Sequence, residues 1–131
     1  TLRRIAGLMK ERSYVSGEKV FAQGDVGDEV FLVRRGSVRI MLPLEKGKYH
    51  HLATIGRGDF FGEVAFLDRG HRSADAVAKV PTDLFVLSRS QFNKLSRSDA
   101  TVGVQIFARV AHALAIRLRQ ADAELRTLEE R

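Results

Sequence analysis

Residues 60–75 read FFGEVAFLDRGHRSAD, and both the expected fold and the expected site follow from this stretch. Gly62 lets the backbone approach a ligand closely, and the carboxylate of Glu63 can only accept hydrogen bonds, which suits a sugar hydroxyl. Arg72 carries a planar guanidinium that binds a phosphate through two parallel charge-assisted hydrogen bonds. Free backbone N–H groups at the start of a short helix would add to this contact. The stretch predicts a site for a small ligand with a phosphate and a sugar.

The same stretch resembles the phosphate-binding cassette of cyclic nucleotide-binding domains of the catabolite activator and cAMP receptor-like family. That cassette reads Phe-Gly-Glu-aliphatic-Ala, a short spacer and Arg-Ser/Thr-Ala, and residues 61–65 and 72–74 match every defining position. The resemblance implies that Arg72 pairs with the cyclic phosphate and that Glu63 accepts from the ribose 2′-hydroxyl. It also implies that backbone N–H groups of Gly62, Ser73 and Ala74 complete the phosphate nest. The implied cassette ligands are Gly62, Glu63, Val64, Ala65, Arg72, Ser73 and Ala74.

Length and composition are those of one folded domain. The chain has 131 residues, 44% of them hydrophobic, which is enough for a buried core. It has no cysteine, which excludes disulfides and thiolate-held metal centres. The formal net charge is +6, but Arg and Lys are scattered, so charge alone does not argue for nucleic-acid binding. No apolar run approaches the roughly 20 residues of a membrane span.

The pattern outside the cassette predicts a mainly β fold with flanking helices. Residues 1–12 have apolar residues at helical spacing and predict a short N-terminal helix. Residues 13–88 alternate short apolar runs with glycine-containing turns, which is typical of a sandwich or jelly-roll barrel. We expect the strands on either side of residues 34–37 to pair, and Pro43 to lie on an edge strand because it cannot donate to a ladder. The resembled family has such a β-roll with a cassette helix, and its ligand lies inside.

Residues 89–131 predict two helices, the second of them long. Ser88 is expected to cap the first, and either Ser98 or Asp99 the second. The resemblance implies that the long helix forms a homodimer and closes over the bound base. The alternative is a helix folded back on its own barrel. Apolar residues recur along it at steps of four and three, as in a heptad seam, at Phe107, Ala111, Leu114, Leu118, Ala121, Leu125 and Leu128.

The base of the nucleotide is expected between aliphatic side chains of the barrel and the long helix. Val64 and Val77 are candidates on the barrel side. The family's cAMP-sensing members often have a hydroxyl residue on the helix, whereas residues 120–122 of this chain have none, so base selectivity stays open. The family's bacterial members favour cAMP over cGMP. By similarity, the base or lid candidates on the helix are Arg117, Gln120, Ala121 and Asp122.

A metal-dependent cupin-type enzyme is the main alternative for a similar β-roll. Cupin sites need two histidines one residue apart on a strand, with a carboxylate nearby, so that the ligands share one face. His50 and His51 are adjacent and would point to opposite faces, while His71 and His112 lie in other segments. No Ser-His-Asp or paired-carboxylate arrangement stands out. The sequence therefore predicts no catalytic residue, no metal and no cofactor beyond the nucleotide ligand.

The expected role is that of a non-catalytic regulatory domain that relays nucleotide binding through its C-terminal helix. The output would be that of a fused transcription, channel or transporter module, or that of a kinase-type regulatory subunit. The chain begins at Thr1 and stops at Arg131, which suggests a sensor domain of a larger protein, without a winged helix and without direct nucleic-acid binding. The expected location is the cytoplasm, including the cytoplasmic part of a membrane protein.

Overall fold

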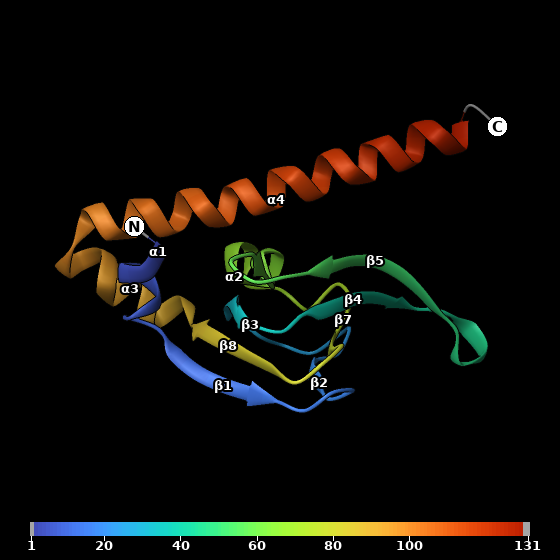
Figure 1. Ribbon diagram of the computed structural model, residues 1–131. Coiled ribbons are helices and arrows are strands. Elements are labelled where there is room, and N and C mark those ends of the chain that lie inside the picture. Colours follow the sequence, from blue (N-terminus) through green and yellow to red (C-terminus); the bar gives the residue numbers. More distant parts are fainter. Residues whose placement is uncertain (1, 130–131) are drawn as a thin grey trace.

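Two antiparallel four-stranded sheets face each other as a roll, with the helices on one side of it (Figure 1). The computed structural model describes residues 2–129, so Thr1, Glu130 and Arg131 of the expected terminal segments lie outside the described residues. The predicted mainly β architecture with flanking helices is confirmed. The elements in chain order are α1 (Leu2–Ala6), β1 (Lys10–Tyr14), β2 (Lys19–Phe21), β3 (Val30–Arg35), β4 (Val38–Pro43), the 3-10 turn η1 (Glu45–Gly47), β5 (Tyr49–Ile55), β6 (Phe60–Phe61), α2 (Glu63–Asp68), β7 (Asp75–Ala78), β8 (Thr82–Leu87), α3 (Arg89–Ser98) and α4 (Ala100–Glu129).

The turn at Gly36 carries the chain from one sheet to the other. The sheets have the strand orders β1-β8-β3-β6 and β2-β7-β4-β5, so the predicted pairing of the strands flanking residues 34–37 is wrong. At Gly36 the backbone φ is +95°, and a Cβ would lie 2.5 Å from Oγ1 of Thr82. Glycine alone fits this conformation and this close approach. The turn therefore separates β3 and β4 instead of closing a hairpin.

Pro43 lies at the end of an internal strand, and the predicted edge strand is wrong. β4 pairs with β7 through Val38–Met41 and with β5 along its other side, so β5 is the edge. The β7 ladder has ended before Pro43, which faces Tyr49 across the β4–β5 hairpin. The missing N–H is tolerated there because no β7 group lies opposite it.

The N-terminal helix is shorter than the spacing of apolar residues predicts. α1 ends at Ala6, and from Lys10 the chain pairs with β8 as β1, three residues before the predicted start of the β region. Ile5 and Met9 are nevertheless buried in the same cluster. Their spacing reflects a common core and not one continuous helix, because pairing with β8 overrides a weak local propensity.

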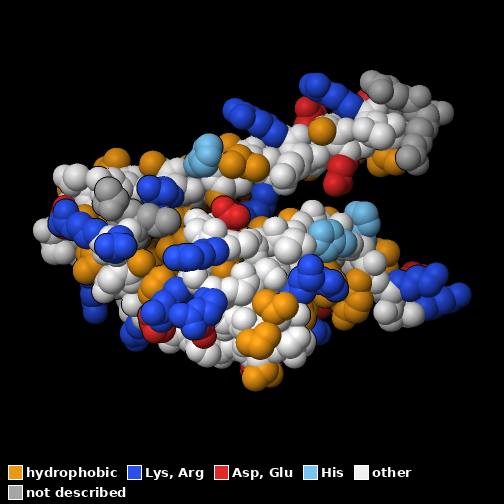
Figure 2. All heavy atoms as spheres, in the orientation of Figure 1, with side chains coloured by type: hydrophobic (Ala, Val, Ile, Leu, Met, Phe, Trp, Pro, Cys, Tyr) orange, Lys and Arg blue, Asp and Glu red, His pale blue; other side chains and the backbone are white. Residues whose placement is uncertain are grey.

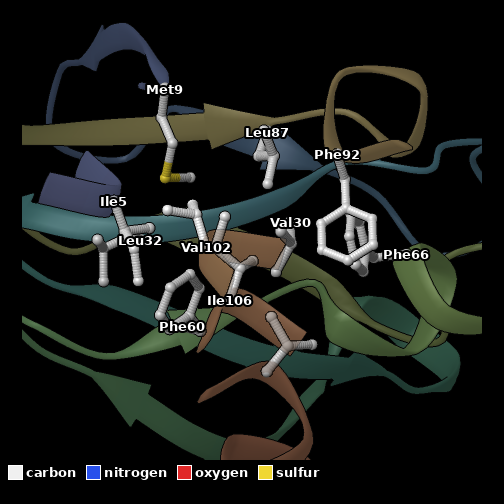
Figure 3. Packing of buried hydrophobic residues seen from close by; sticks show 11 residues of the cluster. Ile5, Met9, Val30, Leu32, Phe60, Phe66, Leu87, Phe92, Val102 and Ile106 are labelled. Carbon is white, nitrogen blue, oxygen red and sulfur yellow. The ribbon is translucent and has the colours of Figure 1, made fainter. Parts of the chain in front are cut away.

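Two clusters of buried apolar residues hold the roll and the helices together. One lies inside the roll, where the rings of Phe31 and Phe61 stack with centroids 5.0 Å apart. The other lies between the helices and the roll, and Figure 3 shows Val102 and Ile106 of α4 among its members. The first part of α4 is thereby anchored on the barrel.

Both C-terminal helices begin where the sequence predicts. Gln91 N donates to Ser88 Oγ at 3.2 Å and Ser88 N donates to Gln91 Oε1 at 3.1 Å, a reciprocal capping box at the start of α3. Asp99 Oδ1 accepts from Val102 N at 3.2 Å, so Asp99 rather than Ser98 caps α4. A polar side chain therefore marks each helix start.

The apolar seam of α4 is largely exposed within the described residues. Phe107, Leu118, Leu125 and Leu128 are between 46% and 62% exposed, whereas Val102, Ile106 and Val110 are buried against the barrel. Figure 2 shows the C-terminal part of α4 standing clear of the roll. The start of the helix thus folds back on its own barrel, and its seam stays available.

By length and composition alone, α4 could also cross a membrane. An 18-residue window of the helix reaches a mean hydropathy of 1.2, although its apolar runs are short. This is weak support for a membrane position, because the burial of Val102, Ile106 and Val110 explains the apolar residues of the first part of the helix.

Candidate functional site

A cavity of about 240 Å³ opens between the roll, α2 and α4. All seven predicted cassette residues line it, and so do three of the five predicted base or lid residues. The structure therefore brings the cassette and the long helix to one cavity. These ten residues are Gly62, Glu63, Val64, Ala65, Arg72, Ser73, Ala74, Arg117, Gln120 and Ala121.

Gly62 joins β6 to α2 with its backbone in the left-handed region, at φ 80° and ψ 13°. A Cβ here would lie 3.0 Å from Nη1 of Arg72 and 3.1 Å from the carbonyl oxygen of Glu29. The glycine is therefore required both for the turn and for the approach of the arginine. The first N–H groups of α2, which starts at Glu63, have no partner inside the helix.

Arg72 is buried, with 5% of its surface exposed, and its guanidinium is held by main-chain carbonyls. Nη1 donates to the carbonyl of Gly62 at 3.1 Å, and Nη2 donates to the carbonyl of Glu29 at 2.9 Å. The backbone N–H of Arg72 donates to the carbonyl of Asp25 at 2.8 Å. The backbone and the guanidinium of Arg72 are thus both held by hydrogen bonds to main-chain carbonyls.

Burial and nearby carboxylates have opposite effects on the pKa of Arg72. Burial is the largest influence and lowers the pKa of Arg72 from its ordinary value, while nearby carboxylates, in the order Glu29, Asp28, Asp25 and Glu63, raise it. A guanidinium has an ordinary pKa far above neutrality and stays protonated. The cavity is therefore lined by a buried permanent cation, a natural partner for an anion.

Glu63 is equally buried and pairs with the long helix. Nη1 of Arg117 contacts Oε1 of Glu63, and Nη2 of Arg117 donates to the carbonyl of Phe60. Similarity suggested a contact of Arg117 with the base, but its guanidinium lies at the carboxylate expected to hold the ribose. One ion pair therefore ties α4 to the cassette.

Val77 does not line the cavity, which corrects its expected contact with the base. It lies on β7 between Ala76 and Ala78, which are buried in the roll. Side chains alternate along a strand, so Val77 points to the opposite face, where it lies beside Arg39 of β4.

Asp122 is also outside the cavity. It is exposed and pairs with Arg126 one turn later, with Nη2 and Oδ2 3.1 Å apart. Successive helix residues are turned by roughly 100° from each other, so Ala121 lines the cavity while its neighbour faces away. The expected lid contact of Asp122 is corrected accordingly.

Several lining residues were not predicted from the sequence. Leu114 lies three residues before Arg117 and Glu124 seven residues after it, so helical spacing could have found these two, whereas Leu118 directly follows Arg117. The strand residues carry no motif of their own, because only the closure of the roll brings them to the cavity. The missed residues include Phe21, Ile40, Leu52, Leu114, Leu118 and Glu124.

The histidines do not form a shared site in the part of the chain that the structure describes. His50 and His51 lie on the exposed edge strand β5, and His51 Nε2 hydrogen-bonds with Thr54 Oγ1 at 2.9 Å. No group of three or more His, Asp or Glu side chains with metal-binding geometry occurs among residues 2–129.

Known proteins are similar to this chain in sequence and in fold. Residues 11–99 match the family model described as "Cyclic nucleotide-binding domain". The "Cyclic AMP receptor protein" of Thermus thermophilus is 40% identical over 116 residues, 88% of this chain and 52% of that protein. The "cGMP-dependent protein kinase, isozyme 1" of Drosophila melanogaster is 33% identical over 97 residues, 72% of this chain and 13% of that protein. The crystal structure of the Thermus thermophilus Catabolite Activator Protein has a TM-score of 0.81 at 37% identity, over 98% of this chain and 58% of that one.

The chain spans about half the length of the receptor relative and a small part of the kinase. The cassette, residues 60–75, lies inside the range that matches the family model, whereas α4, with Arg117 and Gln120, begins after residue 99. The family model thus covers the cassette, while the similarity to the Thermus thermophilus structure, over 98% of this chain, extends along α4 as well.

Proposed function

The chain belongs to the family of cyclic nucleotide-binding domains, and we propose that its cavity binds cAMP, in preference to cGMP, as a regulatory ligand. The observation that carries the proposal is the meeting of two buried groups, Arg72 and Glu63, at one cavity beside α4. A guanidinium and a carboxylate suit the phosphate and the ribose hydroxyl of one small ligand. Under this proposal the chain senses the nucleotide and does not transform it.

Arg72 and the backbone N–H groups of Gly62, Ser73 and Ala74 hold the cyclic phosphate in this scheme. A guanidinium has five N–H donors, and main-chain carbonyls accept from two of them. Three donors are left for an anion. Charge-assisted bonds to phosphate are short and strong, especially where water is excluded.

Glu63 accepts from the ribose 2′-hydroxyl while it remains close to Arg117. A carboxylate offers about four acceptor positions on two oxygens, so it can serve both partners. A ligand shifts an equilibrium only through contacts that differ between the two states. In this proposal the Glu63–Arg117 ion pair differs between the free and the bound state. It joins the ligand site to α4, and a hydroxyl bound at Glu63 would change how strongly the carboxylate holds Arg117.

The base occupies the apolar part of the cavity, and Gln120 reads its edge. Leu52, Val64 and Leu118 supply aliphatic surface beside it. The amide of Gln120 offers one acceptor and one donor side by side, which match the amino group and the ring nitrogen of adenine. An amide turned by 180° also pairs with the carbonyl oxygen and the ring N–H of guanine, so Gln120 can bind either base. The 40% identity of this chain with a protein named for cyclic AMP supports cAMP as the preferred ligand.

A homodimer through α4 is part of the proposal. Phe107, Leu118, Leu125 and Leu128 form an exposed apolar stripe with heptad spacing, which is typical of a helix that packs against a second helix. A second copy would cover this stripe. The open hollow of about 760 Å³ between β5 and α4 is lined by other residues of the helix, such as Ile116 and Ala123, which lie on its opposite side.

We place the chain, as a further part of the proposal, in a larger cytoplasmic protein whose effector is driven by the position of α4. The relatives include a receptor protein and a protein kinase, so the same domain occurs beside different effectors. A transcription, channel or transporter module would each fit. The domain itself acts without catalysis, metal or contact with nucleic acid.

Removal of the Arg72 guanidinium tests the proposed function. We expect the chain to bind cAMP in calorimetric titration, and Arg72→Ala to bind it about 100-fold more weakly or worse, since truncating one member of a desolvated charge pair costs about 2–5 kcal/mol. Arg34→Ala is the matched control, because Arg34 is an exposed arginine of β3 paired with Glu11.

Circular dichroism and melting of each variant separate unfolding from loss of binding. Equal affinity in a folded Arg72→Ala variant, or no binding of either cyclic nucleotide by the unchanged chain, would contradict the proposal.

A further inference from the structure

We infer that Phe21 is a positioning residue that holds the guanidinium of Arg72 in the plane required for phosphate binding. The inference rests on the proposed function and adds a residue outside the cassette to the phosphate site. Phe21 ends β2 and lines the same cavity as Arg72, from which it is separated by 51 positions in the sequence.

The ring of Phe21 is the nearest aromatic surface to the guanidinium. Its centroid lies 4.3 Å from Cζ of Arg72, while the Phe31 centroid lies at 5.6 Å. Both distances are within the range in which a cation is attracted to a ring face. The pair is also enclosed, because Arg72 is 5% exposed. Attraction to a ring is larger for a desolvated cation than for one in water.

Glycine backbone lies close to other atoms of the same guanidinium. A Cβ at Gly27 would lie 3.1 Å from both Nε and Nη2 of Arg72, and one at Gly62 would lie 3.0 Å from Nη1. Two carbonyl groups fix the directions of two N–H bonds, and the ring fixes the plane. The remaining N–H donors are therefore oriented before any anion arrives, which lowers the ordering cost of binding.

Phe21 is itself braced by the core. Its centroid lies 5.9 Å from that of Phe31 and 6.1 Å from that of Phe61, with both ring pairs tilted by 38°. The β2–β7 register shifts between Lys19 and Phe21, and a shift of this kind re-aims a side chain. The ring is thus supported by Phe31 and Phe61 and lies at the cavity, next to an irregularity in the β2–β7 ladder.

The chain contains a second arginine–phenylalanine pair that serves as a control. Arg34 Cζ lies 5.9 Å from the centroid of Phe85, and that pair does not line the cavity. The same substitution at Phe85 therefore removes a ring beside an arginine without touching the phosphate site.

The experiment compares Phe21→Leu, Phe21→Tyr and Phe85→Leu by calorimetric titration with cAMP. Leucine keeps an apolar side chain but has no ring face, so we expect affinity to fall roughly three- to thirtyfold, the fold-change that corresponds to a cation–π contact. Tyrosine keeps the ring and is expected to retain affinity within about twofold, as is Phe85→Leu. Addition of Phe21→Leu to Arg72→Ala should cost less than it does alone, because coupled residues are not additive.

A spectroscopic readout separates positioning from general stability. We expect the Arg72 Nε–H resonance of the unchanged protein to be resolved, shifted by the ring and slow to exchange, and to move toward the values of surface arginines in Phe21→Leu. Equal cAMP affinity of the leucine variant, or full additivity with Arg72→Ala, would overturn the inference and leave the proposed function intact. If the unchanged chain binds no cyclic nucleotide, the proposed function fails and the inference with it. Should Phe21→Leu not fold, an unshifted, fast-exchanging Arg72 Nε–H in the unchanged protein would overturn it.

Discussion

The cassette and the long helix meet at the same cavity, but they are held in opposite ways. Arg72 and Glu63 of the cassette are buried, and carbonyls, an ion pair and a phenylalanine ring fix their positions. Beyond Arg117, the described residues of α4 are exposed. The end of the cavity proposed for phosphate and ribose is therefore preorganised, whereas the proposed contact with the base would depend on where the helix lies.

The largest of the three effects expected from this comparison tests whether the cassette is as rigid as the comparison requires. Gly62→Ala places a Cβ 3.0 Å from Arg72 Nη1, so we expect at least a tenfold loss of cAMP affinity in addition to a backbone strain of about 1–2 kcal/mol. Gly47→Ala is the matched control, since Gly47 also has positive φ, at 70°, but open space around it. Calorimetry and urea unfolding measure the two effects. Similar cAMP affinities for the two variants would show that the cassette backbone and Arg72 can shift to accommodate the added Cβ.

An intermediate effect is expected at the contact between the two regions. Arg117→Ala leaves the buried Glu63 without its partner, and we expect a loss of roughly 1–3 kcal/mol in unfolding free energy, less than for a fully buried pair because Arg117 is partly exposed. The protection that cAMP confers on α4 amides in hydrogen exchange should also disappear.

Arg119→Ala is the control, because Arg119 is exposed and lies about 200° around the helix from Arg117. Ligand-dependent protection of α4 that persists in Arg117→Ala would mean that the helix senses the nucleotide by another route.

The smallest expected effect concerns the exposed half of the site. Gln120→Glu removes the amide donor to the adenine ring nitrogen and adds an acceptor, so the ratio of cAMP to cGMP affinity should fall about fivefold, the worth of one net hydrogen bond. Asp122→Asn changes charge on the outer face and should leave the ratio unchanged. Parallel titrations with both nucleotides give the answer. An unchanged ratio in Gln120→Glu would remove this residue from base selection.

The cassette was predictable because its chemistry is local. Gly62, Glu63 and Arg72 lie within eleven consecutive residues, and the short helix between them leaves few ways to arrange their groups. All seven predicted cassette residues line the cavity. Their contact with a nucleotide stays a prediction. The starts of α3 and α4 were predictable for the same reason, since Ser88 and Asp99 bond to N–H groups three residues later.

The errors occurred where distant segments decide the outcome. The residues around Gly36 are typical of a hairpin turn, yet β3 pairs with β8 and β4 pairs with β7. Val77 and Asp122 were each one residue away from positions that face inward, because neither the strand nor the helix face is defined without its packing partner.

The sequence by itself determined which chemical groups the site contains, because the cassette motif places a guanidinium, a carboxylate and a permissive glycine on one short segment. The tertiary structure alone decided what surrounds them. Phe21 reaches Arg72, and Arg117 reaches Glu63, only after two sheets have closed and a helix has packed across them. Such contacts depend on long-range burial, which no local spacing of residues encodes.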